Sequence, residues 1–401
     1  MSLVDTLAVQ NDKKILLVVL DGLGGLPVNG KTELETAAKP NLDRLAYKSF
    51  IGLHMPVGLG ITPGSGPAHL ALFGYDPVEY QVGRGVLEAL GVDLQLHPDD
   101  LCARANFATL GLDGKLTDRR AGRIATKQSA ELCAWLAKAI PRIEDVEVIV
   151  RPGKEHRFVV VFRGPGLDTG LTDSDPQHEG VSPLTVTALR PEAEKSARVV
   201  NAFLAECAKA LTAESKANYV LVRGLDRPPQ ILSMQQRFKL KPACVAVYPM
   251  YKGLARLVGM EVVDAGNTWD SELAALRAAW SQHDFFFVHF KDTDKAGEDG
   301  DFERKVELIE QFDEEVVPGL LRLKPDVLLV TGDHSTPTTL AGHSWHPVPF
   351  LLRSPYVRLQ SGVEDFGERS CARGSLGGAM PACELMQLML ANALKLKKFG
   401  A

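Results

Sequence analysis

A serine between two glycines is the first candidate for chemistry in this sequence. Ser65 lies in the segment GITPGSGPAHLALFGYDP, residues 60–77, directly before a run that looks like a helix. A serine there would lie on a tight turn near a helix N-terminus, where backbone amides and the helix dipole favour an incoming phosphate. An isolated Gly-Ser-Gly tripeptide is more often a plain turn or helix cap. Ser65 therefore becomes a candidate nucleophile only if other residues support it.

Acidic and imidazole side chains supply that support. Asp21 follows one apolar run, and the pair Asp333 and His334 follows another. Carboxylates and imidazoles are common metal ligands, and a bound divalent cation lowers the pKa of a serine hydroxyl. Each of these residues alone could be an ordinary loop residue. Together with Ser65 they indicate metal-assisted phosphotransfer.

The apolar runs before these residues predict buried parallel strands of an α/β fold. Three such runs end in polar or glycine-rich loops, at residues 15–20, 285–290 and 327–330. Between them, apolar residues at helical spacing predict covering helices at 40–50 and 302–323.

The predicted strand ends bring distant side chains together. Ligands of open α/β sheets bind beyond the carboxyl ends of the strands. Asp21, Asp333 with His334, and either Asp292 or Asp294 come just after the three predicted strands. We therefore expect these side chains to meet in one crevice, although they are far apart in the sequence.

The middle of the chain predicts a second domain inserted into the first. Strand-like runs at 103–110, 146–150 and 157–164 are mixed with helix-like segments at 126–139 and 191–212. This mixture differs from the apolar parallel-strand pattern on either side of it, so it indicates a separate sheet with its own helices.

The chain length also predicts two domains. A chain of 401 residues is too long for one hydrophobic core, since single cores stop growing at roughly 250 to 300 residues. We place the inserted substrate-binding domain at residues 92–240. Residues 1–91 and 241–401 are then a discontinuous, metal-binding phosphotransfer core.

Composition and charge exclude several classes of protein. The formal net charge of −5 argues against a nucleic-acid binder, because such proteins carry a strong basic excess. The apolar runs are too short to span a membrane, and the N-terminal residues do not read as a secretory signal. The six cysteines are scattered singly, which is typical of buried thiols in a reducing compartment. We expect a cytoplasmic protein that binds neither nucleic acid nor membrane.

A series of motifs extends this interpretation over nearly the whole chain. In order they are VVLDGLGG, the Ser65 motif, GRGVLEALG, RANFATL, DRRAGRI, KEHRFVVVFRG, TDSDP, DTDKAGEDGDFERK, and TGDHSTP with HSWHPVPFLL. They resemble the archaeal type of cofactor-independent phosphoglycerate mutase, a member of the alkaline phosphatase superfamily. The resemblance implies an α/β fold: an alkaline-phosphatase-like three-layer core around a mostly parallel sheet, plus a smaller inserted α/β domain.

The resemblance also implies two divalent metal ions at the serine. Carried over position by position, the first ion would be held by Asp21, Ser65, Asp333 and His334, and the second by Asp294, the residue at 298 and His343. Two such ions stabilise the attacking and leaving oxygens of an in-line displacement. We expect Mn²⁺, with Mg²⁺, Co²⁺ or Zn²⁺ as the other possible ions.

Position 298 departs from the family pattern. The family usually shows histidine in TDExGHDGD, whereas this chain reads TDKAGEDGD and offers Glu298. A helical turn would bring Asp294 and Glu298 to one side, and a carboxylate favours harder ions such as Mn²⁺ or Mg²⁺ over Zn²⁺. We expect Glu298 to be a ligand. The alternative is a solvent-facing Glu298 and a second site that is either weak or remade by His346, the second histidine of HSWHP.

Arginines of the inserted segment suit an anionic substrate. A molecule with a phosphate and a carboxylate needs several fork-like donors, and guanidinium groups supply them bidentately. The candidates lie in the family-like segments RANF, DRRAGR and KEHRF: Arg104, Arg119, Arg120, Arg123 and Arg157. We expect at least one or two of the five to be ordinary solvated surface residues.

Two further residues have candidate roles. Asp118, beside these arginines, is a candidate general base for the glycerate hydroxyl, or else the salt-bridge partner of an arginine. Lys252 in YPMYKGLARLVGM is a candidate to neutralise phosphate charge near the nucleophile, although a loop lysine is usually just solvated.

The mechanism implied by the resemblance interconverts 3-phosphoglycerate and 2-phosphoglycerate through a phosphoserine at Ser65, without 2,3-bisphosphoglycerate. The glycerate must stay trapped while it re-orients, because an open site would let water hydrolyse the phosphoserine. The alternatives are a phosphopentomutase or phosphomonoesterase of the same superfamily, or a non-catalytic metabolite-binding protein disabled by Glu298. The arginine-rich insert favours a small, doubly anionic substrate.

Overall fold

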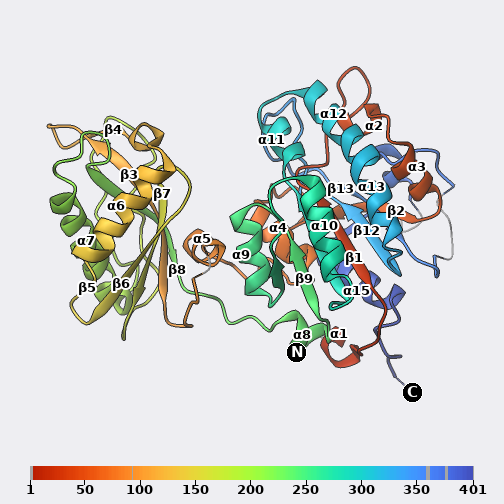
Figure 1. The fold of residues 1–401 in the computed structure, drawn as a ribbon, viewed down its shortest axis with the longest axis horizontal. Helices are drawn as coiled ribbons and strands as arrows, with labels where there is room; N and C mark the ends of the chain where they lie inside the picture. The colour runs from red at the N-terminus through yellow and green to blue at the C-terminus, as the bar shows by residue number, and fades with distance from the viewer. Residues whose placement is uncertain (1–2, 93, 358–361, 375–377, 401) are drawn as a thin grey trace. The chain divides into compact units, whose positions relative to one another are not determined.

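The three apolar runs form neighbouring strands at the centre of an eight-stranded sheet in the computed structural model (Figure 1). The structure describes residues 3–92, 94–357, 362–374 and 378–400. These residues belong to two units. The core unit is Met1–Gln81 with Ile231–Ala401, and the inserted unit is Val82–Gln230.

The sheet of the core unit is mostly parallel, which confirms the predicted α/β fold. Strands β12 and β13 and strands β13 and β2 pair antiparallel, and the other neighbours pair parallel. In spatial order the strands are β10 (Glu261–Val263), β9 (Pro242–Val245), β11 (Phe285–Phe290), β1 (Ile15–Leu20), β12 (Val327–Thr331), β13 (Val348–Arg353), β2 (Phe50–Met55) and β14 (Ala379–Pro381).

Helices of the core unit cover both faces of this sheet. On β11, Phe286 and Phe290 belong to one apolar core, whereas Phe287 and His289 contact aromatic rings of α4 and α9 on the other face. Burial on both faces explains why these strands are continuous apolar runs. The helices are α1 (Leu3–Leu7), α2 (Glu33–Thr36), α3 (Pro40–Tyr47), α4 (Ser65–Leu72), α8 (Met234–Phe238), α9 (Pro249–Leu257), α10 (Trp269–Ala279), α11 (Asp292–Glu298), α12 (Phe302–Gln311), α13 (Val317–Arg322), α14 (Glu368–Ala372) and α15 (Cys383–Asn392).

The helix predicted at 302–323 is interrupted. A π-helical turn, Phe312–Val316, joins α12 to α13, and Pro318 lies in the first turn of α13. Proline has no backbone N–H and disfavours regular α-helix just before it, and a π-turn adapts the chain to this.

The carboxyl ends of three central strands meet at one edge of the sheet. Strand β1 lies between β11 and β12 and is parallel to both, with Leu20 beside Phe290 and Val19 beside Thr331. The residues that follow the three strands therefore emerge next to one another, as the sequence predicted.

The inserted unit has its own antiparallel sheet. In spatial order it contains β4 (Leu116–Asp118), β3 (Leu101–Leu110), β7 (Arg157–Arg163), β6 (Val146–Pro152) and β5 (Arg142–Ile143), and β8 (Tyr219–Asp226) also pairs with β3. Helices α6 (Thr126–Ala139) and α7 (Glu194–Ala210) pack on one face, and α5 (Arg84–Gly91) packs on the other. Short 3₁₀ turns lie at Ala121–Arg123 and Pro191–Ala193.

The borders of the inserted unit differ from the expected 92–240. The unit begins at Val82 because Val86 and Ala89 of α5 pack on Cys102 of β3. It ends at Gln230 because the next helix belongs to the core unit, where Phe238 contacts Tyr75.

Two sequence-based expectations, one about the cysteines and one about membrane-spanning segments, concern the whole chain. All six cysteines are free thiols, and five of them are buried. None of the helices in the described part of the chain is both long and apolar enough to cross a membrane.

Candidate active site

Ser65 is the first residue of α4, and the extended Gly64 precedes it as the N-cap. Its side chain is partly exposed. The Ser65 Oγ atom lies 3.1 Å from Nε2 of His334, and its carbonyl accepts a hydrogen bond of 2.8 Å from Nδ1–H of His69. The predicted helix start and the serine–histidine neighbourhood are therefore both present.

The first metal-ligand cluster consists of Asp21, Asp333 and His334, all fully buried. Nε2 of His334 lies 3.1 Å from Oδ2 of Asp333 and 3.4 Å from Oδ1 of Asp21. Neither of these carboxylate oxygens has a partner in hydrogen-bond geometry among the described residues. Buried carboxylate oxygens without hydrogen bonds are costly unless a cation satisfies them. The cluster therefore fits a divalent cation.

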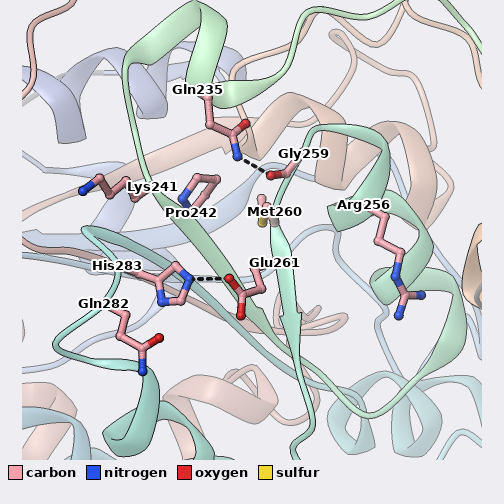
Figure 2. A pocket seen from close by; sticks show the side chains of 9 residues that line it. All are labelled: Gln235, Lys241, Pro242, Arg256, Gly259, Met260, Glu261, Gln282 and His283. Carbon is pink, nitrogen blue, oxygen red and sulfur yellow. Dashed lines mark hydrogen bonds and ion pairs between the residues drawn. The ribbon is translucent and has the colours of Figure 1, made fainter.

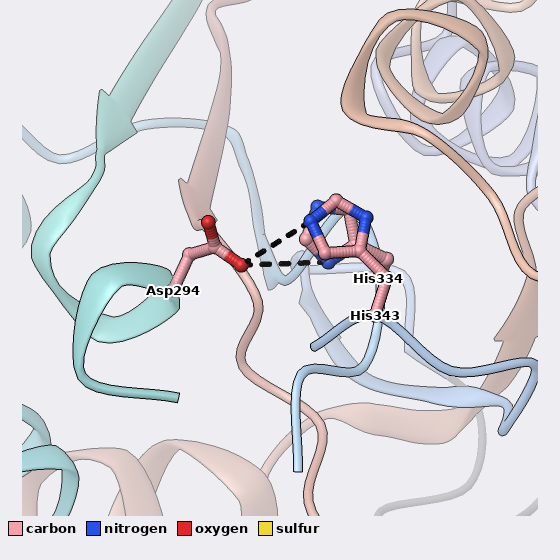
Figure 3. A group of neighbouring side chains, drawn as sticks. All are labelled: Asp294, His334 and His343. Carbon is pink, nitrogen blue, oxygen red and sulfur yellow. Dashed lines mark ion pairs between the residues drawn. The ribbon is translucent and has the colours of Figure 1, made fainter. Parts of the chain in front are cut away.

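The second cluster consists of Asp294, His334 and His343 (Figure 3). Oδ1 of Asp294 lies 3.6 Å from Nε2 of His343 and 3.9 Å from Nδ1 of His334. Nδ1–H of His343 donates to the carbonyl of Pro63 at 2.9 Å. This bond leaves the Nε2 lone pair directed toward Asp294, which is how protein structures orient metal-binding histidines.

Glu298 lies at the open side of the second cluster. It is one helical turn after Asp294 on α11, and its Oε1 lies 3.8 Å from Nε2 of His343. Its side chain is 53% exposed, and it does not belong to the tight group of three ligands. Nδ1 of the alternative ligand, His346, lies 3.0 Å from the hydroxyl of Ser344. Neither ligand group found among the described residues includes His346.

The buried carboxylates control the protonation of His334. Burial alone would lower the pKa of this imidazole, but Asp333, Asp21 and Asp294 raise it to about 9. In return, burial would raise the pKa of Asp333, and the His334 and His69 charges lower it strongly. A metal ligand must be deprotonated, so a cation entering the site displaces a proton from His334.

The structure adds three residues at Asp21 that sequence reasoning missed. The Tyr251 hydroxyl donates to Oδ2 of Asp21, and the same oxygen lies 3.0 Å from Nε2 of His289 and 3.1 Å from Nζ of Lys291. The rings of Tyr251 and His289 stack with centroids 3.6 Å apart. A histidine within the apolar run FFFVHF was a sequence signal for His289.

Lys291 and Thr336 connect the two clusters. Lys291 Nζ also donates to Oδ2 of Asp294 at 2.5 Å. The Thr336 hydroxyl donates to Oδ1 of Asp294 at 2.7 Å and lies 2.9 Å from Nδ1 of His334. The spacing of Lys291 three residues before Asp294, typical of a helical ion pair, was available in the sequence.

Lys252, the predicted phosphate partner, is half-buried next to Tyr251 on α9. Burial and the Asp292 charge raise the pKa of Glu272 to about 8, and the Lys252 charge opposes this shift. The ammonium group that pairs with Asp21 belongs to Lys291, not to Lys252.

Two predicted arginines of the inserted unit have unsatisfied donors. The Nε atoms of Arg104 and Arg157 are buried and have no hydrogen-bond partner among the described residues. Burial, followed by the Arg84 charge, lowers the pKa of Arg104 to about 10, and Arg157 and Arg223 contribute to the shift. Arg84 and Arg223 therefore join this arginine group, although neither was singled out from the sequence.

The other predicted residues of the inserted unit lie around a turn. Arg119 forms a bidentate pair with the buried Asp175, at 2.8 and 2.6 Å. Both carboxylate oxygens of Asp118 accept backbone N–H groups, from Arg120 at 2.7 Å and from Gly122 at 2.6 Å. The last of the five predicted arginines, Arg123, is exposed in the same turn.

Sequence comparisons with known proteins lead to one family. A model of the 2,3-bisphosphoglycerate-independent phosphoglycerate mutase family matches residues 46–217. A probable enzyme of that name from Aquifex aeolicus is 53% identical over 411 residues, which cover 100% of both chains. A probable one from Thermus thermophilus is 52% identical over 400 residues, 98% of each chain.

Two solved structures are similar over nearly the whole chain. The cofactor-independent phosphoglycerate mutase from Thermoplasma acidophilum has a TM-score of 0.71 and 33% identity, and the match covers 95% of this chain and 100% of that one. The PH0037 protein from Pyrococcus horikoshii has a TM-score of 0.82 and 31% identity, with 97% and 100% covered. Because relatives about half identical in sequence align from end to end, the chain belongs to the 2,3-bisphosphoglycerate-independent phosphoglycerate mutase family.

Proposed function

We propose that this chain is an isomerase that interconverts 3-phosphoglycerate and 2-phosphoglycerate through a phosphoserine at Ser65, without 2,3-bisphosphoglycerate. The observation that carries the proposal is the position of Ser65 Oγ, 3.1 Å from His334, the one residue common to both ligand clusters. A hydroxyl at that point can attack phosphorus while cations neutralise the transferred oxygens.

The reaction consists of two balanced transfers. Ser65 Oγ forms a bond to phosphorus as the bond from phosphorus to the glycerate oxygen breaks, and the proton lost by the serine ends on that glycerate oxygen. The other hydroxyl of the glycerate then attacks the phosphoserine, the bond between phosphorus and Ser65 Oγ breaks, and the proton lost by that hydroxyl ends on Ser65 Oγ. Asp118 exchanges these protons with the glycerate, oriented by the two backbone N–H groups that it accepts.

Two divalent cations, when bound, supply charge neutralisation and a lower pKa for the serine hydroxyl. The residues that would hold them are Asp21, Ser65, Asp333 and His334 for the first, and Asp294, Glu298 and His343 for the second. Four carboxylates and two imidazoles are a hard, mixed donor set, which favours Mn²⁺ and accepts Mg²⁺ or Co²⁺.

Tyr251, His289 and Lys291 hold Asp21 in place at the first site. Three donors converge on Oδ2 of this carboxylate. Oδ1 has no hydrogen-bond partner among the described residues and is therefore available to a metal ion. Hydrogen bonds of this kind orient metal ligands and tune their affinity.

The inserted unit recognises the anionic groups of the substrate. Arg104 and Arg157 provide buried donors without partners, and Arg120 and Arg123 add exposed guanidinium groups. Arg119 is already paired with Asp175, so its role is to position the turn rather than to bind substrate. Lys252 adds positive charge near Tyr251 in the core unit.

A coupled assay tests this function. Purified protein is given 3-phosphoglycerate and single metals, without 2,3-bisphosphoglycerate, and formation of 2-phosphoglycerate and release of inorganic phosphate are measured together. We expect isomerisation that chelation abolishes and Mn²⁺ restores, with little phosphate released. Release of phosphate in place of isomerisation would indicate a phosphomonoesterase, and full turnover without metal would exclude the two-metal site.

A further inference from the structure

A basic hollow lies on the core unit, away from the residues described above. Its cavity volume is about 530 Å³, and its lining comes from α3, the turn after α13, and the end of β13. Four of the lining side chains are cations: Arg44, Lys48, Lys324 and Arg353. No carboxylate is among the lining residues in the described part of the chain.

The four cations form no ion pair with the described part of the chain. Among the described residues, none of them has an ion pair or a side-chain hydrogen bond, and three acids of the adjoining segments are bound by other groups. Asp326 pairs with Lys13 at 2.8 Å, and Asp43 lies 3.4 Å from Lys39 and accepts the N–H of Phe366 at 2.8 Å. Asp313 accepts the backbone N–H groups of Asn41 and Leu42.

Lys324 has a backbone conformation that needs an explanation. Its φ is 51°, in the left-handed region just after α13, where glycine or asparagine is usual. A lysine there costs on the order of 1 kcal/mol of backbone strain. The strained turn adds a fourth cation to the hollow, which is consistent with a binding role.

A second hollow of the core unit shows the contrast (Figure 2). It has a volume of about 450 Å³, and its lining includes a carboxylate, Glu261, and two pairs of polar groups that bind each other. His283 lies 3.1 Å from Glu261, and Gln235 donates to the carbonyl of Gly259 at 2.5 Å. The two hollows therefore differ in their charges. An accumulation of unpaired cations is also unexpected in a protein whose formal net charge is −5.

The basic hollow is separate from the Ser65 site. Strand β13 is antiparallel to β12, and Arg353 pairs with Leu328 near the start of β12. Asp333 and His334 follow the other end of that strand. Five residues of strand span roughly 17 Å at about 3.3 Å per residue, so the two sites lie at opposite edges of the sheet.

We propose that this hollow binds a small phosphorylated organic anion with at least two negative charges. Two guanidinium and two ammonium groups suit phosphate oxygens. Leu45, Leu321 and Pro325 give the lining an apolar part that can contact a carbon skeleton. The volume lies within the range of small-molecule sites, roughly 300 to 1,000 Å³. This binding is independent of the mutase reaction.

Calorimetric titration with fructose 1,6-bisphosphate tests the proposal, with uncharged fructose as the ligand control. The test variant is Arg44→Gln with Lys324→Gln. Its matched control is Arg322→Gln with Lys398→Gln, which removes the same charge from two exposed residues outside the hollow. A variant with Arg104→Gln and Arg157→Gln removes the competing anion site of the inserted unit.

The bisphosphate is expected to bind the wild type, the matched control and the Arg104/Arg157 variant with similar affinity. The Arg44/Lys324 variant should lose roughly tenfold or more in affinity, because two charged donors are gone. Higher ionic strength should weaken the binding in the three proteins that retain it. Absence of binding at millimolar bisphosphate, equal loss in the matched control, or loss only in the Arg104/Arg157 variant would each overturn the proposal.

Discussion

Nε2 of His334 lies 3.1 Å from Oγ of Ser65, although the two residues are separated by 269 positions in the chain. The same imidazole contacts Asp21 and Asp333 through Nε2 and faces Asp294 through Nδ1. The candidate nucleophile is therefore next to a histidine common to both ligand clusters.

Removing the nucleophile should abolish the reaction and leave the fold intact. Ser65→Ala is expected to retain less than roughly 1% of the mutase rate, because no other hydroxyl can form the intermediate. Its melting temperature should stay close to that of the wild type, since the side chain is partly exposed. Thr62→Ala, an exposed residue of the same loop, is the control and should keep full activity. Substantial turnover by Ser65→Ala would exclude a phosphoserine at this position.

Metal binding should release a proton from His334. The pKa of this imidazole is raised to about 9 in the metal-free protein, so it is protonated at neutral pH and must lose its proton to become a ligand. Apparent metal affinity should rise about tenfold between about pH 7 and about pH 8. Calorimetry in buffers of different ionisation enthalpy measures the released proton directly. The variant His346→Gln, which alters a histidine outside both clusters, should behave like the wild type.

Glu298 is the position where the chain departs from the pattern of its family. If its carboxylate is a ligand, Glu298→Gln should weaken binding of the second ion by roughly tenfold or more and lower activity with it. Glu298→His should keep two ions and shift the preference from Mn²⁺ toward Zn²⁺ or Co²⁺.

The control for position 298 is Glu303→Gln, because Glu303 is an exposed carboxylate at the start of α12. Metal titration of all four proteins provides the comparison. Normal binding of two ions by Glu298→Gln would show that Glu298 is a surface carboxylate, and His346 would then be the first residue to examine as its replacement.

Lys291 should stabilise the metal-free protein by pairing with both clusters. Its ammonium group lies 3.1 Å from Asp21 and 2.5 Å from Asp294, both of which are fully buried. Lys291→Met removes this cation and should cost about 2 kcal/mol of unfolding free energy without metal, less than for a fully buried pair because the lysine is partly exposed. Bound Mn²⁺ should recover much of the loss, which thermal melts with and without metal measure. Lys295→Met, on the exposed face of the same helix, should cause little change.

His54 should make the core unit sensitive to acid. Burial lowers the pKa of this imidazole to about 4, and its buried Nδ1 atom has no hydrogen-bond partner among the residues that the structure describes. In the unfolded chain this histidine is protonated below about pH 6.5, whereas in the folded chain it is protonated only below about pH 4. The free energy of unfolding therefore decreases as the pH falls from about 6.5 to about 4. His54→Gln should remove about 3 kcal/mol of this pH dependence. Equal slopes of stability against pH for the two proteins would contradict the prediction.

The central strands and the place of the site follow from the sequence alone. Strands β1, β11 and β12 are buried on both faces, so each is a predominantly apolar run that the sequence marks as a strand. Parallel strands present their carboxyl ends at one edge, and this rule predicts that Asp21, Asp333 and either Asp292 or Asp294 lie together. The helix start at Ser65 could be predicted for a similar reason, because a Gly-Ser-Gly turn before an apolar run is a local signal.

The choice of partner for each side chain depends on the tertiary structure. The amphipathic segment GRGVLEALG predicts a helix with one buried face. The local sequence does not show that this helix, α5, packs on Cys102 in the inserted unit. In the same way, Tyr251 rather than Lys252 contacts Asp21, because the face of α9 that carries Tyr251 packs against His289 of β11. Arg119 pairs with Asp175, whereas the Nε atoms of Arg104 and Arg157 stay unpaired. These choices depend on distances between segments far apart in the chain, which periodicity and spacing do not contain.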